Sequence, residues 1–263
     1  MSFLETMVAL RRERILAEYG GLDDADRERF AACAAPPRDF AAALRDRQDL
    51  AVIAEVKKAS PSAGPIAPDC DASTQALHYQ DGGAAAISVL TEPDRFGGSF
   101  ADLSDVADAV DVPVLCKDFV VDPVQLFVAR GHGADAILLI VRVLGDLVPN
   151  YADLALTLGL TPVVEVADVA ELPRAWGSGA PVVLVNSRDL RTLKVDPDAQ
   201  AEVIASATRS DALVVAASGI KTRADVERAA AAGATGVLVG ESLMRSAFPE
   251  DVLSELTGVP IRP

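Results

Sequence analysis

From residue 51 onward, the sequence repeats one unit: a short unbroken apolar run followed by a segment with helical character. Unbroken apolar runs of this length are typical of parallel strands buried on both faces. Several helical segments end near a Gly-Ala pair, and glycine is the usual residue just beyond a helix end. The eight apolar runs are 51–56 (AVIAEV), 85–90 (AAISVL), 112–117 (VPVLCK), 136–141 (AILLIV), 162–166 (PVVEV), 181–186 (PVVLVN), 212–217 (ALVVAA) and 236–240 (GVLVG), and the helical segments include 74–80, 124–130, 150–158 and 223–231. This pattern predicts an α/β fold, a (β/α)8 TIM barrel.

Residues 1–50 precede the repeat and have a different pattern. Apolar residues at roughly helical spacing, followed by a face rich in Arg and Glu, predict an N-terminal helix that ends at Gly20-Gly21. A second short helix is predicted over 39–47. We therefore expect a single domain over 1–263, in which a helical extension (1–50) packs on the barrel (51–263). No Gly-x-Gly-x-x-Gly follows the first strand, so a dinucleotide-binding fold has little support.

The charge of the chain limits its partners. The formal net charge is −15, which argues against nucleic acid and anionic membranes because both need a basic surface. A small anionic substrate is compatible with this charge if positive side chains gather locally. The sequence has neither an apolar run of membrane-spanning length nor a secretory signal, so we expect a cytoplasmic protein. Cys33, Cys70 and Cys116 are too scattered for a disulfide framework or a zinc site.

Lysine is rare and unevenly placed in this chain. There are 19 arginines and 5 lysines, and every lysine falls at the carboxyl end of a predicted strand or in the loop after it. That end of a TIM barrel carries the active site, and a lysine amine, unlike a guanidinium, can be tuned to exchange a proton. Chance is a competing explanation for Lys58, Lys194 and Lys221. It is a weaker one for Lys57 and Lys117, which follow apolar strand residues.

Carboxylate and amide side chains accompany these lysines. Glu55 shares one face of the first strand with Lys57, because the two are two positions apart in the sequence. Glu165 interrupts an apolar strand, where an unpaired carboxylate would be costly to bury. Two roles are about equally expected for Glu165: acid–base chemistry, or an ion pair with a lysine of a neighbouring strand. Asn186 ends the sixth strand and is suited to orienting a substrate. Because no metal-ligand cluster appears, the predicted chemistry uses Lys and Glu without a metal or an imidazole.

The last two strands end in small residues. Ser218-Gly219 follows the seventh strand and Gly240-Glu241 the eighth. Small residues allow backbone N–H groups to face an anion, and the loops after these two strands are the common phosphate site of the TIM barrel. The two turns therefore predict a phosphate-binding site.

With these residues in place, the chain resembles the indole-3-glycerol phosphate synthase family of tryptophan biosynthesis from about residue 39 to 245. Two matching segments are long and specific to the family, 53–64 (IAEVKKASPSAG) and 113–125 (PVLCKDFVVDPVQ). The others are 87–100 (ISVLTEPDRFGGSF), 163–166 (VVEV), 185–190 (VNSRDL), 217–220 (ASGI) and 237–244 (VLVGESLM). The resemblance implies a TIM barrel with an N-terminal helical extension. It also implies a cofactor-free ring closure of 1-(2-carboxyphenylamino)-1-deoxyribulose 5-phosphate, with loss of carbon dioxide and water.

The resemblance also implies roles for the catalytic residues. Lys117 matches the general acid that protonates the ribulose carbonyl, and Glu165 matches a group that moves protons during dehydration. Lys57 pairs with the substrate carboxylate and assists dehydration, while Glu55 tunes the charge beside it. Asn186 orients the substrate.

The binding positions follow from the same resemblance. Arg188 supports the carboxylate end of the substrate, and Phe96 and Phe119 match apolar positions that wall its aromatic ring. The positions that match phosphate-binding residues are Ser60, Ser218, Gly219, Gly240 and Glu241, the later ones through backbone N–H groups. We also group Ser218 with the catalytic residues.

One position departs from the family pattern. The family usually has Glu-Ser-Gly-Ile at the end of the seventh strand, whereas this chain has Ala217 in place of the glutamate. We expect the same reaction at a lower rate. Two alternatives are an enzyme like phosphoribosyl-anthranilate isomerase, which Lys117 argues against, and a non-catalytic paralogue that binds phosphorylated ligands. The sequence leaves the oligomeric state and contacts with other tryptophan-pathway enzymes open.

Overall fold

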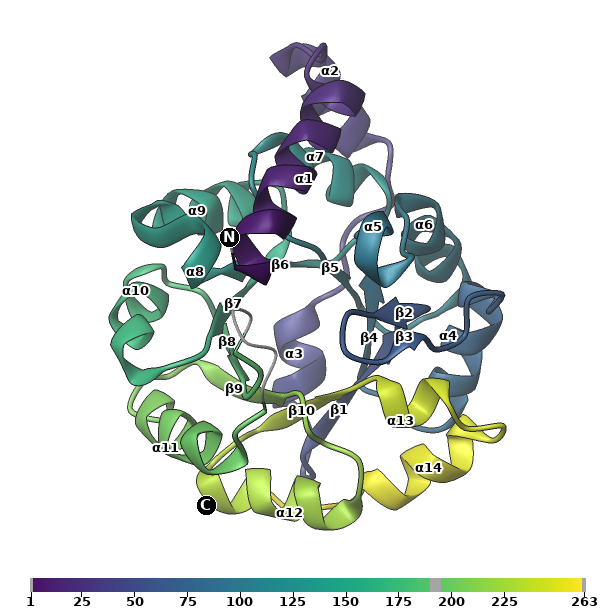
Figure 1. The fold of residues 1–263 in the computed structure, drawn as a ribbon, viewed down its shortest axis with the longest axis vertical. Helices are drawn as coiled ribbons and strands as arrows, with labels where there is room; N and C mark the ends of the chain where they lie inside the picture. Colours follow the sequence, from purple (N-terminus) through teal and green to yellow (C-terminus); the bar gives the residue numbers. More distant parts are fainter. Residues whose placement is uncertain (1, 190–194, 262–263) are drawn as a thin grey trace.

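A closed barrel of parallel strands lies at the centre of the molecule (Figure 1). The structure is a computed structural model that describes residues 2–189 and 195–261, so Leu190 and Lys194 of the sequence predictions lie outside the described residues. Within the described residues, eight strands close in the order β1-β10-β9-β8-β7-β6-β5-β4, which confirms the predicted TIM barrel. The strands are β1 (Ala51–Val56), β4 (Ala86–Leu90), β5 (Val114–Lys117), β6 (Ala136–Ile140), β7 (Thr161–Val166), β8 (Val182–Asn186), β9 (Leu213–Ala217) and β10 (Gly236–Val239).

Helices surround this ring of strands (Figure 1). The longer ones are α4 (Ala72–Asp81), α6 (Phe100–Ala109), α7 (Val124–Gly131), α9 (Val148–Thr157), α10 (Leu172–Gly177), α11 (Pro197–Ala207), α12 (Arg223–Ala232) and α14 (Pro249–Leu256). Short elements lie in the loops after the strands: the hairpin β2 (Ala59–Ser60) and β3 (Gly64–Pro65), the helices α5 (Pro93–Phe96), α8 (Val141–Leu144) and α13 (Glu241–Met244), and the 3-10 turns η1 (Gly145–Leu147) and η2 (Val169–Glu171). No helix in the described ranges is long and apolar enough to cross a membrane.

The N-terminal extension contacts both ends of the barrel. Helix α1 (Phe3–Tyr19) begins at a capping box made by Ser2 and Glu5, and it runs over the rim near β5 and β6 (Figure 1). Helix α3 (Phe40–Arg45) lies behind the ring of strands in that view and buries Phe40 and Leu44 in the barrel interior.

The sequence predictions for the extension differ from the structure in two places. Helix α2 (Asp24–Ala32), which packs beside α7, was not predicted, because its strongly polar sequence shows no apolar stripe. Its start does carry a signal, since the side chain of Asp23 accepts a hydrogen bond from the backbone of Asp26. Helix α3 is shorter than the predicted 39–47, because Asp39 caps its start and the helix ends at Arg45, with Asp46 as its C-cap.

The alternation of side chains along each strand positions the site. Ile53, Leu115 and Val163 point into the barrel, whereas Val52 and Cys116 pack under the outer helices. Side chains two residues apart share a face of a strand, so the next inward positions lie at the carboxyl rim. They are occupied by Glu55 after Ile53, Lys117 after Leu115, Glu165 after Val163, Asn186 after Leu184, Ala217 after Val215 and Gly240 after Leu238.

Candidate active site

A cavity of about 540 Å³ opens at the carboxyl ends of the strands. It brings together most of the predicted site residues: Glu55, Lys57, Ser60, Phe96, Lys117, Asn186, Arg188, Ser218, Gly219, Gly240 and Glu241. The other two, Phe119 and Glu165, line a smaller adjoining cavity of about 40 Å³. The two cavities share Phe96, Lys117 and Asn186, so the predicted site residues line two neighbouring cavities.

An ion cluster occupies the floor of the main cavity. Glu55 is buried, and its Oε1 lies 2.7 Å from Lys57 Nζ while its Oε2 lies 3.1 Å from Lys117 Nζ. Burial alone would raise the pKa of Glu55, but attraction to Lys117 and Lys57 outweighs it and lowers that pKa to about 2. Burial lowers the pKa of Lys117, yet Glu55 and Glu165 together raise it above its usual value. Lys117 is therefore protonated at neutral pH and has a proton to donate.

Glu165 has a different environment from Glu55. Its Oε1 accepts a hydrogen bond from Asn186 Nδ2 at 3.1 Å. Burial raises the pKa of Glu165, and attraction to Lys117 and the bond from Asn186 only partly oppose this. The ion pair of Lys117 is made with Glu55, so the charge of Glu165 is stabilised less fully. Two carboxylates whose pKa values are shifted in opposite directions can serve different roles in acid–base chemistry.

The glycine at the end of β10 makes room for the ion cluster. A Cβ atom at Gly240 would lie 2.5 Å from Glu55 Oε1 and 3.1 Å from Lys57 Nζ. The carboxylate therefore occupies the space that any side chain at position 240 would need. This steric reason for glycine is separate from the predicted role of Gly240 in phosphate binding.

An aromatic wall borders the cavity on the side of β4 and β5. The ring centroids of Phe96 and Phe119 are 6.2 Å apart, with the planes tilted by 49°. Phe96 is the last residue of α5, and the side chain of Glu92 caps this short helix by accepting hydrogen bonds from the N–H groups of Asp94, Arg95 and Phe96. Glu92 also borders the smaller cavity and was missed from the sequence.

The opposite end of the main cavity carries the predicted phosphate turns. Among the described residues other than glycine, Ser218 is the one with a positive φ, at 67°, and Gly219 follows at 78°. This left-handed conformation is strained for serine. It is supported from the residue just after β8, because the Ser187 hydroxyl donates a 3.0 Å hydrogen bond to the Ser218 carbonyl.

Positive charge gathers around the cavity although the chain as a whole is acidic. Its described lining holds five basic side chains and three carboxylates: Lys57, Lys117, Arg188, Lys221 and Arg228 against Glu55, Asp225 and Glu241. A concave surface with this excess attracts small anions. In the ranges 2–189 and 195–261, no group of His, Cys, Asp and Glu side chains could hold a metal ion.

The cavity also includes residues that the sequence did not predict. Phe3 from α1 lines it, although the extension was interpreted mainly as packing. Thr222, Asp225 and Arg228 line it from the start of α12, where Thr222 and Asp225 form a capping box. The Thr-x-x-Asp pattern could have indicated this helix start. Nothing in the local sequence around Phe3 indicates a place in the cavity.

Replacing Glu55 by Gln is expected to reduce stability in a pH-dependent way. A carboxylate whose folded pKa is about 2, against an ordinary 4.5, stabilises the fold fully above pH 4.5 and loses this contribution as the pH falls through 2. Thermal unfolding of Glu55→Gln should show a deficit on the order of 3 kcal/mol at pH 7 that shrinks between pH 4.5 and 2. Glu227→Gln, at an exposed ion pair with Arg223, is the control and should show little deficit at any pH. A Glu55→Gln deficit that stays constant down to pH 2 would contradict this assignment.

Comparison with known sequences places the chain among relatives of one kind. The model of the family described as indole-3-glycerol phosphate synthase matches residues 4–256. A relative named indole-3-glycerol phosphate synthase, from Mycobacterium ulcerans, is 49% identical over 227 residues, which cover 86% of this chain and 83% of the relative. One of the same name from Rhodococcus jostii is 43% identical over 264 residues, which cover 100% of this chain and 97% of the relative.

Solved structures resemble the chain in fold. A 3-hexulose-6-phosphate synthase aligns with a TM-score of 0.65, covering 79% of this chain and 98% of that one. A mutant tryptophan synthase α-subunit from Pyrococcus furiosus aligns with a TM-score of 0.61, covering 80% and 98%. Each is 16% identical in sequence, so this likeness shows the TIM-barrel fold alone.

Proposed function

The chain belongs to the indole-3-glycerol phosphate synthase family, and from this premise we propose how its cavity closes the indole ring. The substrate is 1-(2-carboxyphenylamino)-1-deoxyribulose 5-phosphate, and the reaction, which releases carbon dioxide and water, makes the protein a carbon–carbon lyase. The observation that carries this proposal is the cluster in which one buried carboxylate, Glu55, contacts two lysines at the floor of a cation-rich cavity. Action in the cytoplasm and contacts with other tryptophan-pathway enzymes remain predictions.

The two ends of the cavity suit the two ends of this substrate. Phe96 and Phe119 offer apolar surface to the aromatic ring. Lys57 and Arg188 line the cavity where they can pair with the ring carboxylate. The phosphate lies at the Ser218-Gly219 and Gly240-Glu241 turns, where Lys221 and Arg228 add positive charge. Ser60 borders the same cavity from β2.

Lys117 acts as the general acid of the first step. The ring carbon that carries the carboxylate attacks the ribulose carbonyl carbon, and a carbon–carbon bond forms as the carbonyl oxygen takes a proton from Lys117 Nζ. Glu55 keeps this amine protonated at neutral pH, since it raises the pKa of Lys117. The carboxylate then leaves as carbon dioxide, and its bonding electron pair returns to the ring.

Dehydration completes the indole. The new hydroxyl group leaves as water after it gains a proton, while the five-membered ring loses one. Glu165 takes part in these transfers, because burial raises its pKa toward the range in which a carboxyl group exchanges protons at neutral pH. Asn186 bonds to Glu165 and orients it toward the substrate.

The test is to incubate the purified protein with this substrate and follow the absorbance of the indole product. We expect turnover without any added cofactor. Absence of product at saturating substrate, from protein that is folded by circular dichroism, would overturn the proposed function.

Ala217→Glu is expected to raise kcat, by up to about 10-fold, less than the ~10²-fold that a primary acid or base supplies. Ala217 occupies the inward rim position between Asn186 and Leu238, so a carboxylate there would join the acid–base groups. Ala217→Gln, which adds the same bulk without charge, is the matched control. Equal kcat in the two variants would show that a missing carboxylate does not limit this protein.

A further inference from the structure

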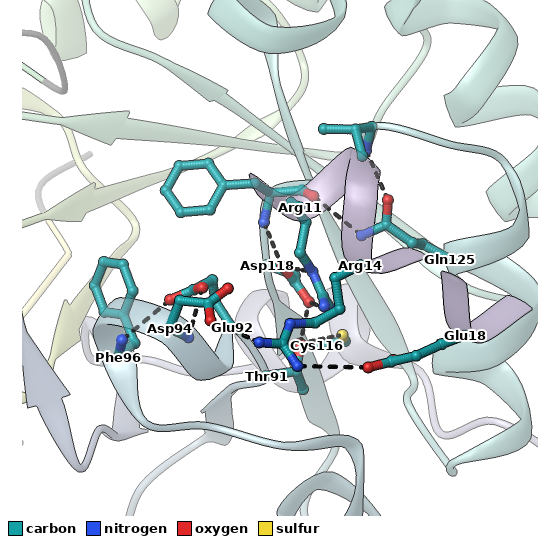
Figure 2. Close-up of polar contacts among 12 residues, drawn as sticks. Arg11, Arg14, Glu18, Thr91, Glu92, Asp94, Phe96, Cys116, Asp118 and Gln125 are labelled. Atoms are coloured by element: carbon teal, nitrogen blue, oxygen red, sulfur yellow. Dashed lines mark hydrogen bonds and ion pairs between the residues drawn. The ribbon is translucent and has the colours of Figure 1, made fainter. Parts of the chain in front are cut away.

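A buried ion pair joins the N-terminal helix to the rim of the barrel. Arg11 of α1 is only 1% exposed, and its guanidinium binds both oxygens of Asp118: Nε donates to Oδ1 at 2.9 Å and Nη2 to Oδ2 at 2.6 Å. Figure 2 shows Arg11 directed from α1 onto Asp118. A bidentate pair of this kind fixes the orientation of a carboxylate as well as its charge.

Asp118 lies between two site residues, Lys117 and Phe119. Besides the bonds from Arg11, its carboxylate accepts hydrogen bonds from Thr91 Oγ1 at 2.6 Å and from the backbone N–H of Phe119 at 2.7 Å. Every contact therefore holds the same short stretch of backbone just after β5. Asp118 itself borders the smaller cavity, and these four hydrogen bonds fix its carboxylate and the residues on either side of it.

The same face of α1 contacts the second half of the aromatic wall. Arg14, one turn after Arg11, pairs with Asp94 of α5, the helix that ends at Phe96 (Figure 2). Helix α1 thus holds the segments after β4 and β5 that carry Phe96 and Phe119. Arg14 and Asp94 are more exposed than Arg11 and Asp118, and an exposed pair contributes little on its own.

We propose that Arg11 is a positioning residue for the ring closure, which it assists by holding Asp118 and, through it, Lys117 and Phe119 at the rim. The N-terminal helix then supports catalysis by holding the rim in place, although no atom of Arg11 touches the substrate. This inference rests on the proposed function, because Lys117 must be the acid for its placement to affect the rate.

The chain supplies a matched comparison at the other end of the barrel. Arg38, also in the extension, binds Asp135 through both oxygens, with its backbone N–H at 2.7 Å and Nε at 2.8 Å. Asp135 lies just before β6, so this pair fastens the extension at the amino ends of the strands, away from the cavity. Arg11→Met removes the ion pair at the carboxyl end of the barrel. Arg38→Met removes the guanidinium contact at the amino end and keeps the backbone hydrogen bond to Asp135.

The experiment compares kcat and KM of these two variants. We expect Arg11→Met to lower kcat about 10- to 100-fold, the size of loss that a displacement of about 1 Å in a reacting group can cause. Its KM should change less than threefold, while Arg38→Met should keep kcat within twofold of the unaltered protein. If both variants lower kcat equally, or if Arg11→Met mainly raises KM, the proposal is wrong.

A second variant separates positioning from stability. In Arg11→Met/Asp118→Asn the unpaired buried charge is gone, so Tm should return toward that of the unaltered protein. The kcat should stay low, because the amide has no guanidinium to hold it. Recovery of kcat together with Tm would overturn the proposal. If Arg11→Met does not fold, Arg11→Lys replaces it, since a lysine keeps the charge but cannot form the bidentate pair.

Hydrogen exchange gives a readout that does not depend on turnover. The N–H of Phe119 donates to Asp118, so exchange in residues 113–125 should accelerate in Arg11→Met and remain unchanged in Arg38→Met. If the unaltered protein makes no product, the proposed function fails, and this exchange pattern still decides whether Arg11 holds the rim. Equal exchange in both variants would mean that it does not.

Discussion

Lys117→Ala is expected to lower kcat by about 10²- to 10⁴-fold, the range lost with a general acid. Lys117 Nζ lies 3.1 Å from Glu55 Oε2 and borders both cavities, so it can reach a substrate oxygen from a fixed position. Its raised pKa means that the proton is present at neutral pH. Alanine removes the proton donor and leaves Glu55 paired with Lys57.

The measurement is steady-state turnover with a matched lysine control. Lys58→Ala removes an amine one residue beyond Lys57 that pairs with Asp102 and does not line the described cavity. It should keep kcat within about twofold, because this amine does not border the described cavity and has no place in the proposed proton transfers. KM of Lys117→Ala should change less than its kcat, since the lost interaction strengthens in the transition state. Near-full turnover by Lys117→Ala would refute the mechanism.

Gly240→Ala is expected to be the second most damaging change, with a loss of about 100-fold in kcat. The added Cβ would overlap Glu55 Oε1 at 2.5 Å. Glu55 is buried, so its carboxylate must turn away from Lys57 or from Lys117, and the charges of the site are rearranged. Overpacking of this kind also destabilises a protein by about 1–3 kcal/mol.

Gly177→Ala is the control for this substitution. A Cβ at Gly177 would meet no atom within 4 Å, and the residue ends helix α10, where alanine is favourable. Its activity should match that of the unaltered protein. Its Tm should be equal to that of the unaltered protein or slightly higher. Full activity in Gly240→Ala would show that the contact between Glu55 and Lys57 is not needed for turnover.

The residues that sequence reasoning placed well are those whose position follows from strand register. Glu55 and Lys57 share a face because strand side chains alternate, and the closed barrel turns that shared face inward. Glu165 interrupts an apolar strand, and this could be read directly from its neighbours. In the structure, Glu165 bonds to Asn186, whereas Lys117 forms its ion pair with Glu55. Which carboxylate pairs with the lysine depends on side-chain distances, which the sequence does not give.

The residues that sequence reasoning missed act through tertiary contacts. Arg11 lies on a helix face rich in Arg and Glu, where nothing in the local pattern separates it from Arg12 or Arg14. Its burial follows from the packing of α1 on the rim, and Phe3 reaches the cavity for the same reason. The sequence also carries no sign of the positive φ of Ser218, because a serine in a turn usually indicates ordinary turn geometry.

The contact of Arg11 with Asp118 spans 107 positions of the chain, and this distance has a consequence for synthesis on the ribosome. At roughly 5–20 residues per second, Asp118 is made about 5–20 s after Arg11. During that interval, the apolar side chains Leu4 and Met7, which are buried against the barrel in the folded protein, have no barrel to pack against. The first helix to be synthesised therefore settles into its final place only after the middle of the barrel exists.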